Sequence, residues 1–156
     1  MLGAMTDQSK IDQSTIEQTI ERWHQHLRGE LPGGLDELLH DDCVFFSPVV
    51  FTPQEGKDVT KLYLEAAGAM FGGDGGEGAD GTSKVGPKFR YVSETMSNNM
   101  AVLQFETEMG GKFVNGVDII TCDDDGKIVE FKVMIRPLQA INAVHEAMRA
   151  MLERMG

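Results

Sequence analysis

The stretch that decides the fold is NGVDIITCDDDGKIVEFKVMIRP, residues 115–137. Two runs rich in β-branched residues flank the acidic turn DDDG, which is the pattern of a β-hairpin. Each predicted strand carries one charged residue among apolar neighbours, Asp118 in the first strand and Arg136 at the end of the second. The face of the sheet that each charge occupies decides whether the hairpin holds a functional site or a structural ion pair.

Two turn geometries fit the sequence, and they place Asp118 on opposite faces. A three-residue loop over 124–126 sets Asp118 opposite Lys132, on the polar face. A two-residue Asp-Gly turn shifts the register by one residue and sets Asp118 opposite Val133, on the apolar face. Both registers stay open at this point. In either one Arg136 lies well along the strand from Asp118, so we expect it to fasten the end of the strand or to contact a dimer partner.

The rest of the chain predicts helices before the sheet and one helix after it. Ser14 and Glu17 have the spacing of a capping box, and apolar residues follow at helical spacing as far as Leu27. From residue 88 onward the hydrophobic period changes to two, which indicates strands. The fold class is therefore α+β, a single domain over 1–156 with a curved antiparallel sheet. The expected helices are 14–28, 35–39, 58–71 and 138–155, and the expected strands are 43–51, 88–96, 100–109, 112–122 and 127–135.

Between the third expected helix and the first strand of the meander lies GGDGGEGADG, residues 72–81. Such glycine-rich sequence cannot bury apolar surface, so we expect a flexible loop over about 72–86 that could cover a pocket. It lacks the Gly-Lys-Ser/Thr ending of a phosphate-binding P-loop.

Composition excludes several classes of function. The 156 residues carry a net charge of −11, which opposes binding to nucleic acid and to anionic membranes. No apolar run is long enough to span a membrane and no signal peptide is recognisable, so a cytoplasmic location is expected. Cys43 and Cys122 are too few for a disulfide framework and are expected to be small buried hydrophobes. No spacing of histidines and carboxylates indicates a metal site.

The order of these elements resembles that of the nuclear transport factor 2-like superfamily, in its SnoaL-like and ketosteroid-isomerase-like branch. The resemblance is carried by LDELLHDDCVFFSPVV (35–50), EGKDVTKLYLEAA (55–67) and VDIITCDDDGKIVEFKVMI (117–135). It implies a cone-shaped, cystatin-like roll in which helices wrap a bent sheet around a largely apolar pocket, here with an extra C-terminal helix. It also implies a homodimer formed through the outer face of the sheet. Because the superfamily includes both enzymes and binding proteins, fold alone does not give the function.

The same resemblance assigns a role to Asp118. Ketosteroid isomerases carry an acid eight residues before the turn glycine of this hairpin, as Asp118 stands before Gly126. There the acid stays protonated inside the pocket and donates a hydrogen bond to the substrate oxygen. The isomerase's catalytic base falls near Ser47 and its phenol near Trp23, so a true ketosteroid isomerase is not expected.

The side chains of His26 and Tyr63 are further candidates for the site. His26, one helical turn after Trp23, is the candidate for proton transfer, with a solvated helix histidine as the alternative. Tyr63 could donate a hydrogen bond or simply pack. The expected substrate-binding residues are Trp23, Ser47, Tyr63, Phe131 and Ile135.

These observations predict a protein that binds a small, mostly apolar, oxygen-bearing molecule. Cofactor-free acid–base chemistry of the isomerase, cyclase or dehydratase type is the catalytic hypothesis, with Asp118 and His26 as its residues; no metal or organic cofactor is implied. The alternative is a non-catalytic ligand-binding or dimerisation module in which the polar residues are structural.

Overall fold

The computed structural model describes residues 14–71 and 89–155, so the predicted glycine-rich loop lies outside the described residues. The fold is α+β, as expected from the sequence. Its helices are α2 (Thr15–Leu27), α3 (Gly34–Leu38), α4 (Lys57–Phe71) and α5 (Leu138–Met155). Its strands are β1 (Leu39–Phe46), β2 (Gln54–Glu55), β3 (Arg90–Ser97), β4 (Met100–Met109), β5 (Lys112–Cys122) and β6 (Ile128–Arg136).

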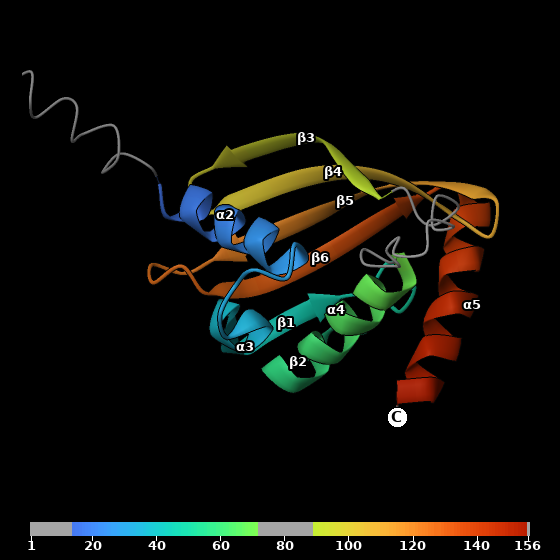
Figure 1. The fold of residues 1–156 in the computed structure, drawn as a ribbon, viewed down its shortest axis with the longest axis horizontal. Helices are drawn as coiled ribbons and strands as arrows, with labels where there is room; N and C mark the ends of the chain where they lie inside the picture. The colour runs from blue at the N-terminus through green and yellow to red at the C-terminus, as the bar shows by residue number, and fades with distance from the viewer. Residues whose placement is uncertain (1–13, 72–88, 156) are drawn as a thin grey trace, which may run out of the picture.

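The six strands form one curved sheet in the order β2-β1-β6-β5-β4-β3 (Figure 1). Strands β3 to β6 are the predicted antiparallel meander, joined by short turns. Strand β1 lies parallel to β6 and is connected to the meander through α4. The sheet curves because each strand twists, and helices α2, α4 and α5 contact the face that curves inward.

Helix α2 begins where the sequence predicts. Ser14 Oγ accepts a hydrogen bond from the backbone N–H of Glu17, and Glu17 Oε1 accepts one from the N–H of Ser14. These bonds satisfy donors that the first helical turn leaves free. On the inner side of the helix, Thr19 donates from its hydroxyl to the carbonyl of Gly126 at 2.9 Å. This contact joins α2 to the turn of the hairpin.

The hairpin combines features of both predicted turns. The loop has three residues, because the N–H of Asp123 bonds the carbonyl of Lys127 and Gly126 adopts a φ of 84°, which favours glycine. The pairing nevertheless sets Asp118 opposite Val133. A β-bulge accounts for this, since Thr121 pairs with residue 130 while the next residue, 122, pairs with 128. The extra residue, 129, shifts the pairing of the two strands by one residue, so that Asp118 lies on the inner face with Val133.

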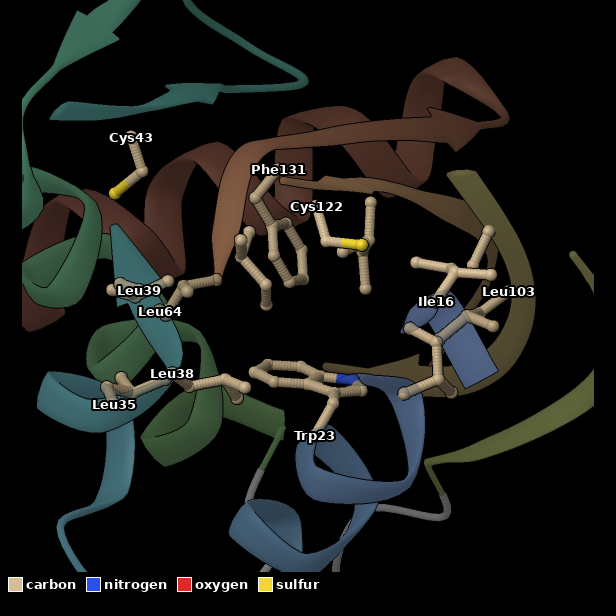
Figure 2. Packing of buried hydrophobic residues seen from close by; sticks show 14 of the residues in the cluster. Ile16, Trp23, Leu35, Leu38, Leu39, Cys43, Leu64, Leu103, Cys122 and Phe131 are labelled. Atoms are coloured by element: carbon tan, nitrogen blue, oxygen red, sulfur yellow. The ribbon is translucent and has the colours of Figure 1, made fainter. Parts of the chain in front are cut away.

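Two buried clusters make up the core. In the larger cluster the indole of Trp23 meets the ring of Phe131 edge-on, with ring centroids 5.0 Å apart, and leucines of α3 and α4 pack beside them (Figure 2). Cys43 and Cys122 are both free and buried in this cluster. The smaller cluster, formed by Phe105, Val114 and Ala140, holds α5 against the sheet.

The predicted bounds differ from the structure mainly around the first strand. The predicted strand over 43–51 begins four residues earlier, at Leu39, and ends at Phe46. Leu39, assigned to a helix from its apolar spacing, pairs instead with Ile128 of β6. Within the described residues no helix is long and apolar enough to cross a membrane.

Candidate active site

A cavity of about 110 Å³ lies between the inner face of the sheet and helices α2, α4 and α5. Its wall is almost entirely aliphatic and aromatic, and its polar groups come from Trp23, Tyr91 and Asp118. A largely apolar pocket with a few convergent polar groups is the usual form of a small-molecule site. The other lining residues are Leu27, Phe45, Pro48, Leu64, Ala67, Gly68, Met70, Phe71, Phe89, Phe105, Phe131, Val133, Ile135, Val144 and Met148.

The polar groups form one chain of hydrogen bonds. Trp23 Nε1 donates to the hydroxyl oxygen of Tyr91 at 3.0 Å, and the Tyr91 hydroxyl donates to Asp118 Oδ2 at 2.6 Å. Tyr91 is the one hydrogen-bond partner of the Asp118 side chain found in the part of the chain that the structure describes. One carboxyl oxygen, Oδ2, is therefore held by Tyr91, while Oδ1 has no such partner among the described residues and belongs to a side chain that lines the cavity.

Burial makes Asp118 an unusual carboxyl. The residue is only 6% exposed, and this desolvation raises its pKa to about 7, although the hydrogen bond from Tyr91 acts in the opposite direction. Burial, and then the neighbouring Asp118 charge, raises the pKa of Tyr91 well above its ordinary value. At neutral pH Asp118 can thus be protonated, and a protonated carboxyl presents an O–H donor. Tyr91 stays a neutral phenol.

The outer side of Tyr91 is closed by a polar pair from α2 and β3. The ring of His24 meets the ring of Tyr91 edge-on with centroids 5.6 Å apart, and His24 Nε2 lies 2.7 Å from Glu94 Oε2. Both side chains are about one-third exposed. The pair therefore stands between the buried chain of hydrogen bonds and solvent.

The structure brings Trp23, Phe131, Ile135 and Asp118 together in the wall of the cavity. His26 is not among the lining residues: it is half-buried, with its ring centroid 5.5 Å from that of Trp23. Burial lowers its pKa. His26 therefore packs against the indole of Trp23 and is not part of the described wall of the cavity.

Ser47 and Tyr63 line a second space, a surface groove of about 350 Å³ beside the cavity. Ser47 Oγ accepts bonds from the N–H groups of Val49 and Val50, at 2.9 and 3.1 Å, so it stabilises the turn that follows β1. The ring of Tyr63 stacks on Phe45 with centroids 5.1 Å apart. Neither residue lines the cavity that holds Asp118.

Arg136 does not pair with Asp118. Its Nη1 donates to Asn115 Oδ1 at 3.3 Å, and Asn115 Nδ2 donates to the carbonyl of Phe105 at 3.1 Å. Arg136 thus fastens the end of β6 to β5. Among the described residues Asp118 has no cationic partner, and burial dominates its pKa.

Tyr91 is the polar residue of the cavity that the sequence did not predict. It lies on β3, and β4 separates β3 from β5, so no direct strand pairing connects Tyr91 to Asp118. Across the inside of the curved sheet, the side chains of Tyr91 and Asp118 together bridge the two strand spacings that separate them. The sequence does indicate that Phe89 and Tyr91, two residues apart, share a face of the sheet. The order of the strands is needed to infer from this that Tyr91 meets Asp118.

The described residues contain no group of three or more histidine, cysteine, aspartate or glutamate side chains that could hold a metal ion. The polar part of the cavity consists of an indole, a phenol and a carboxyl. This set suits hydrogen bonding to an oxygen atom and acid–base chemistry.

Comparison with solved structures gives close matches in fold. A steroid delta-isomerase from Pseudomonas aeruginosa is 30% identical, with a TM-score of 0.76, and the match covers 90% of this chain and 93% of that one. An NTF2-like protein from Mesorhizobium loti is 18% identical, with a TM-score of 0.60, over 79% of this chain and 92% of that one. A protein assigned as a SnoaL-like polyketide cyclase from Jannaschia sp. CCS1 is 14% identical, with a TM-score of 0.58, over 83% and 91%.

No protein-family model and no curated protein sequence matches the chain. The similarity to the isomerase extends over nearly the whole length of both chains, so it concerns the complete fold and not one motif. The two more distant matches support the fold alone.

Proposed function

Because this chain belongs to the nuclear transport factor 2-like superfamily, with isomerase and cyclase proteins among its structural neighbours, we propose that its cavity binds a small, mostly apolar, oxygen-bearing molecule. The carbonyl or hydroxyl oxygen of that molecule would accept a hydrogen bond from the protonated carboxyl of Asp118. The observation that carries the proposal is Oδ1 of Asp118, which has no hydrogen-bond partner among the described residues and belongs to a carboxyl in an apolar cavity whose pKa is about 7.

The geometry supports a specific division of roles. Tyr91 donates to Oδ2, so the acidic proton of Asp118 belongs on Oδ1, the oxygen that has no partner among the described residues. Trp23 in turn fixes the position of the Tyr91 hydroxyl. A donor placed in an apolar cavity stabilises negative charge on a ligand oxygen more strongly than the same donor in water, because the local dielectric constant is low.

Catalysis by this arrangement would use Asp118 as both acid and base. Among the described residues that line the cavity, Asp118 is the one carboxyl, and no histidine or lysine accompanies it. An isomerase, lyase or cyclase reaction would therefore proceed by loss of the Asp118 proton to the substrate and return of a proton to the same carboxyl. A group with a pKa near the working pH suits both steps.

The second candidate is a non-catalytic binding module, favoured because Asp118 is the one carboxyl among those described lining residues and burial keeps Tyr91 a neutral phenol. Both candidates bind the same kind of ligand, and they differ in whether product forms. The expected homodimer stays a separate prediction. Met134 on the outer face of the sheet is 51% exposed, and light scattering would measure the oligomeric state.

The test uses Asp118→Asn, which keeps a hydrogen-bond donor but cannot titrate. Trp23 is the only tryptophan and lines the cavity, so its fluorescence reports occupancy by small ketones such as 2-octanone. Wild-type affinity should fall as the pH rises through about 7, because the ionised carboxyl no longer donates to the ketone oxygen. In Asp118→Asn the affinity should not change with pH.

Asp124→Asn is the matched control, since it makes the same chemical change at an exposed position in the same hairpin. Identical pH profiles for all three proteins would refute the role of Asp118. Incubation with small unsaturated ketones and alcohols, followed by gas chromatography coupled to mass spectrometry, then separates the two candidates, because isomers of equal mass differ in retention time. An enzyme forms product in the wild type and loses it in Asp118→Asn while still binding, whereas a binding module forms none in either protein.

A further inference from the structure

The groove that contains Ser47 and Tyr63 adjoins the cavity directly. Four residues line both spaces, namely Phe45, Pro48, Val144 and Met148. The two spaces are therefore separated by no more than these side chains. The groove, at about 350 Å³, is the larger of the two. A ligand that reaches Asp118 and is too long for the cavity would have this groove to extend into.

Met148 is the most adaptable of the four side chains that line both spaces. It comes from α5, is only partly buried, and carries three rotatable side-chain bonds, so it adapts to neighbours of different shape. Val144, one turn earlier on the same helix, is buried and short. The C-terminal helix thus forms the boundary between cavity and groove.

The two spaces offer different chemistry. The cavity is apolar except for the hydrogen-bond chain at Asp118, whereas the groove also contains polar side chains, including those of Tyr63, His145 and Arg149. Arg149 is already paired with Glu146, at 2.9 Å, so its charge is largely compensated. The hydroxyl of Tyr63 has no hydrogen-bond partner within residues 14–71 and 89–155. It is an available hydroxyl donor, held in place because its ring stacks on Phe45.

We propose that the natural ligand is elongated: its ketone or hydroxyl end lies at Asp118, and an apolar chain passes Met148 into the groove, where a carbonyl, ester or ether oxygen accepts a hydrogen bond from Tyr63. The inference rests on the proposed function of the cavity and adds a ligand class to it. Tyr63, Val49 and Val50 would then select for length and for a second oxygen, while Asp118 recognises the first.

The experiment measures the affinity of straight-chain methyl ketones of six to fourteen carbons through Trp23 fluorescence. In the wild type each added methylene should tighten binding by about four-fold until the groove is filled. Val50→Tyr should end this gain at a shorter chain without weakening the shortest ketones, because Val50 lines the groove and not the cavity. Leu62→Tyr is the control, since Leu62 is partly exposed on α4 and lines neither space.

A second arm tests the hydrogen bond. Long ketones that end in a methyl ester should bind about five-fold more weakly to Tyr63→Phe than to the wild type, the size of one neutral hydrogen bond. Long ketones without the ester should bind both proteins equally, since phenylalanine preserves the stacked ring. Short ketones that bind normally while length and ester add nothing would overturn this inference alone. If no ketone of any length binds, the proposed function fails as well.

Discussion

Replacing Asp118 by asparagine should change how the stability of the protein depends on pH. The folded chain holds this carboxyl at a pKa of about 7, whereas in the unfolded chain its pKa is about 3.9. Between these values the folded protein retains a proton that the unfolded protein has lost. Folding therefore takes up a proton, and the stability contributed by this group falls as the pH rises. It is fully present below about pH 4 and is lost as the pH rises through 7.

The magnitude follows from the two pKa values. A difference of about three pH units corresponds to a loss of roughly 4 kcal/mol in the free energy of unfolding. This loss is complete above pH 7. Between pH 5 and pH 8 the change is roughly 2.5 kcal/mol. Asparagine is nearly the same size, can accept the hydrogen bond from Tyr91, and does not ionise. As the pH rises from 5 to 8, the free energy of unfolding of the variant should thus increase by roughly 2.5 kcal/mol relative to that of the wild type.

Urea unfolding at several pH values, followed by circular dichroism, measures this difference. Asp124→Asn is again the control, because that side chain is exposed and should leave the pH profile of the wild type unchanged. If the free energies of unfolding of the wild type and Asp118→Asn stay parallel from pH 5 to pH 8, Asp118 is not a buried carboxyl with a raised pKa. The proposed hydrogen bond to the ligand would then be refuted.

The remaining predictions concern the neighbours of Asp118. Tyr91→Phe removes the hydrogen bond that opposes the effect of burial, so the pKa of Asp118 should rise above 7 and the protein should lose about 1–3 kcal/mol of stability. The pH profile of ketone binding checks the rise in the pKa of Asp118, and urea unfolding checks the loss of stability. A binding profile identical to that of the wild type would contradict the predicted rise in pKa. Gly116→Ala places a methyl group 2.6 Å from both the carbonyl oxygen of Met134 and the ring of Phe105. It should cost about 1–3 kcal/mol and, because Phe105 lines the cavity, weaken binding of short ketones. If Gly116→Ala unfolds and binds ketones as the wild type does, Phe105 adapts to the added methyl group without cost and the prediction is wrong.

Much of the fold could be predicted because local patterns agree with the final structure. The capping box at Ser14 begins α2, and the period of two over 100–109 and 112–122 marks β4 and β5 with the observed bounds. The first strand was placed too late because Leu39 continues an apolar spacing that begins in α3. Its partner on β6 is almost ninety residues away, and local spacing holds no information about that pairing.

The face of Asp118 could not be read from the hairpin alone. The turn has the three-residue form that predicts an outward Asp118, and a single bulge at Val129 reverses this. Nothing in the alternation of β6 marks that bulge, since Ile128 and Val129 are both apolar. The resemblance to ketosteroid isomerases favoured the inner face because it preserves the spacing between Asp118 and the turn glycine, whatever lies in the second strand.

Other parts of the candidate site depend on contacts between distant segments. Histidine chemistry near neutrality makes His26 a candidate for proton transfer, yet on α2 it contacts Trp23 and does not line the described cavity. Tyr91 was overlooked because its partner lies two strands away. Residue type identifies groups capable of acid–base chemistry, and only the curvature of the sheet determines which of them meet.

The central claim is that Asp118 carries a proton at the pH where the protein binds its ligand. Carbon-13 NMR of the protein labelled at aspartate side-chain carboxyls measures this directly, with the Asp118 signal assigned by its absence in Asp118→Asn. We expect a titration midpoint near pH 7 in the free protein. We also expect that a bound ketone raises that midpoint, because the ligand oxygen accepts from the protonated form. A midpoint below about 5, near that of an ordinary aspartate, would contradict the account.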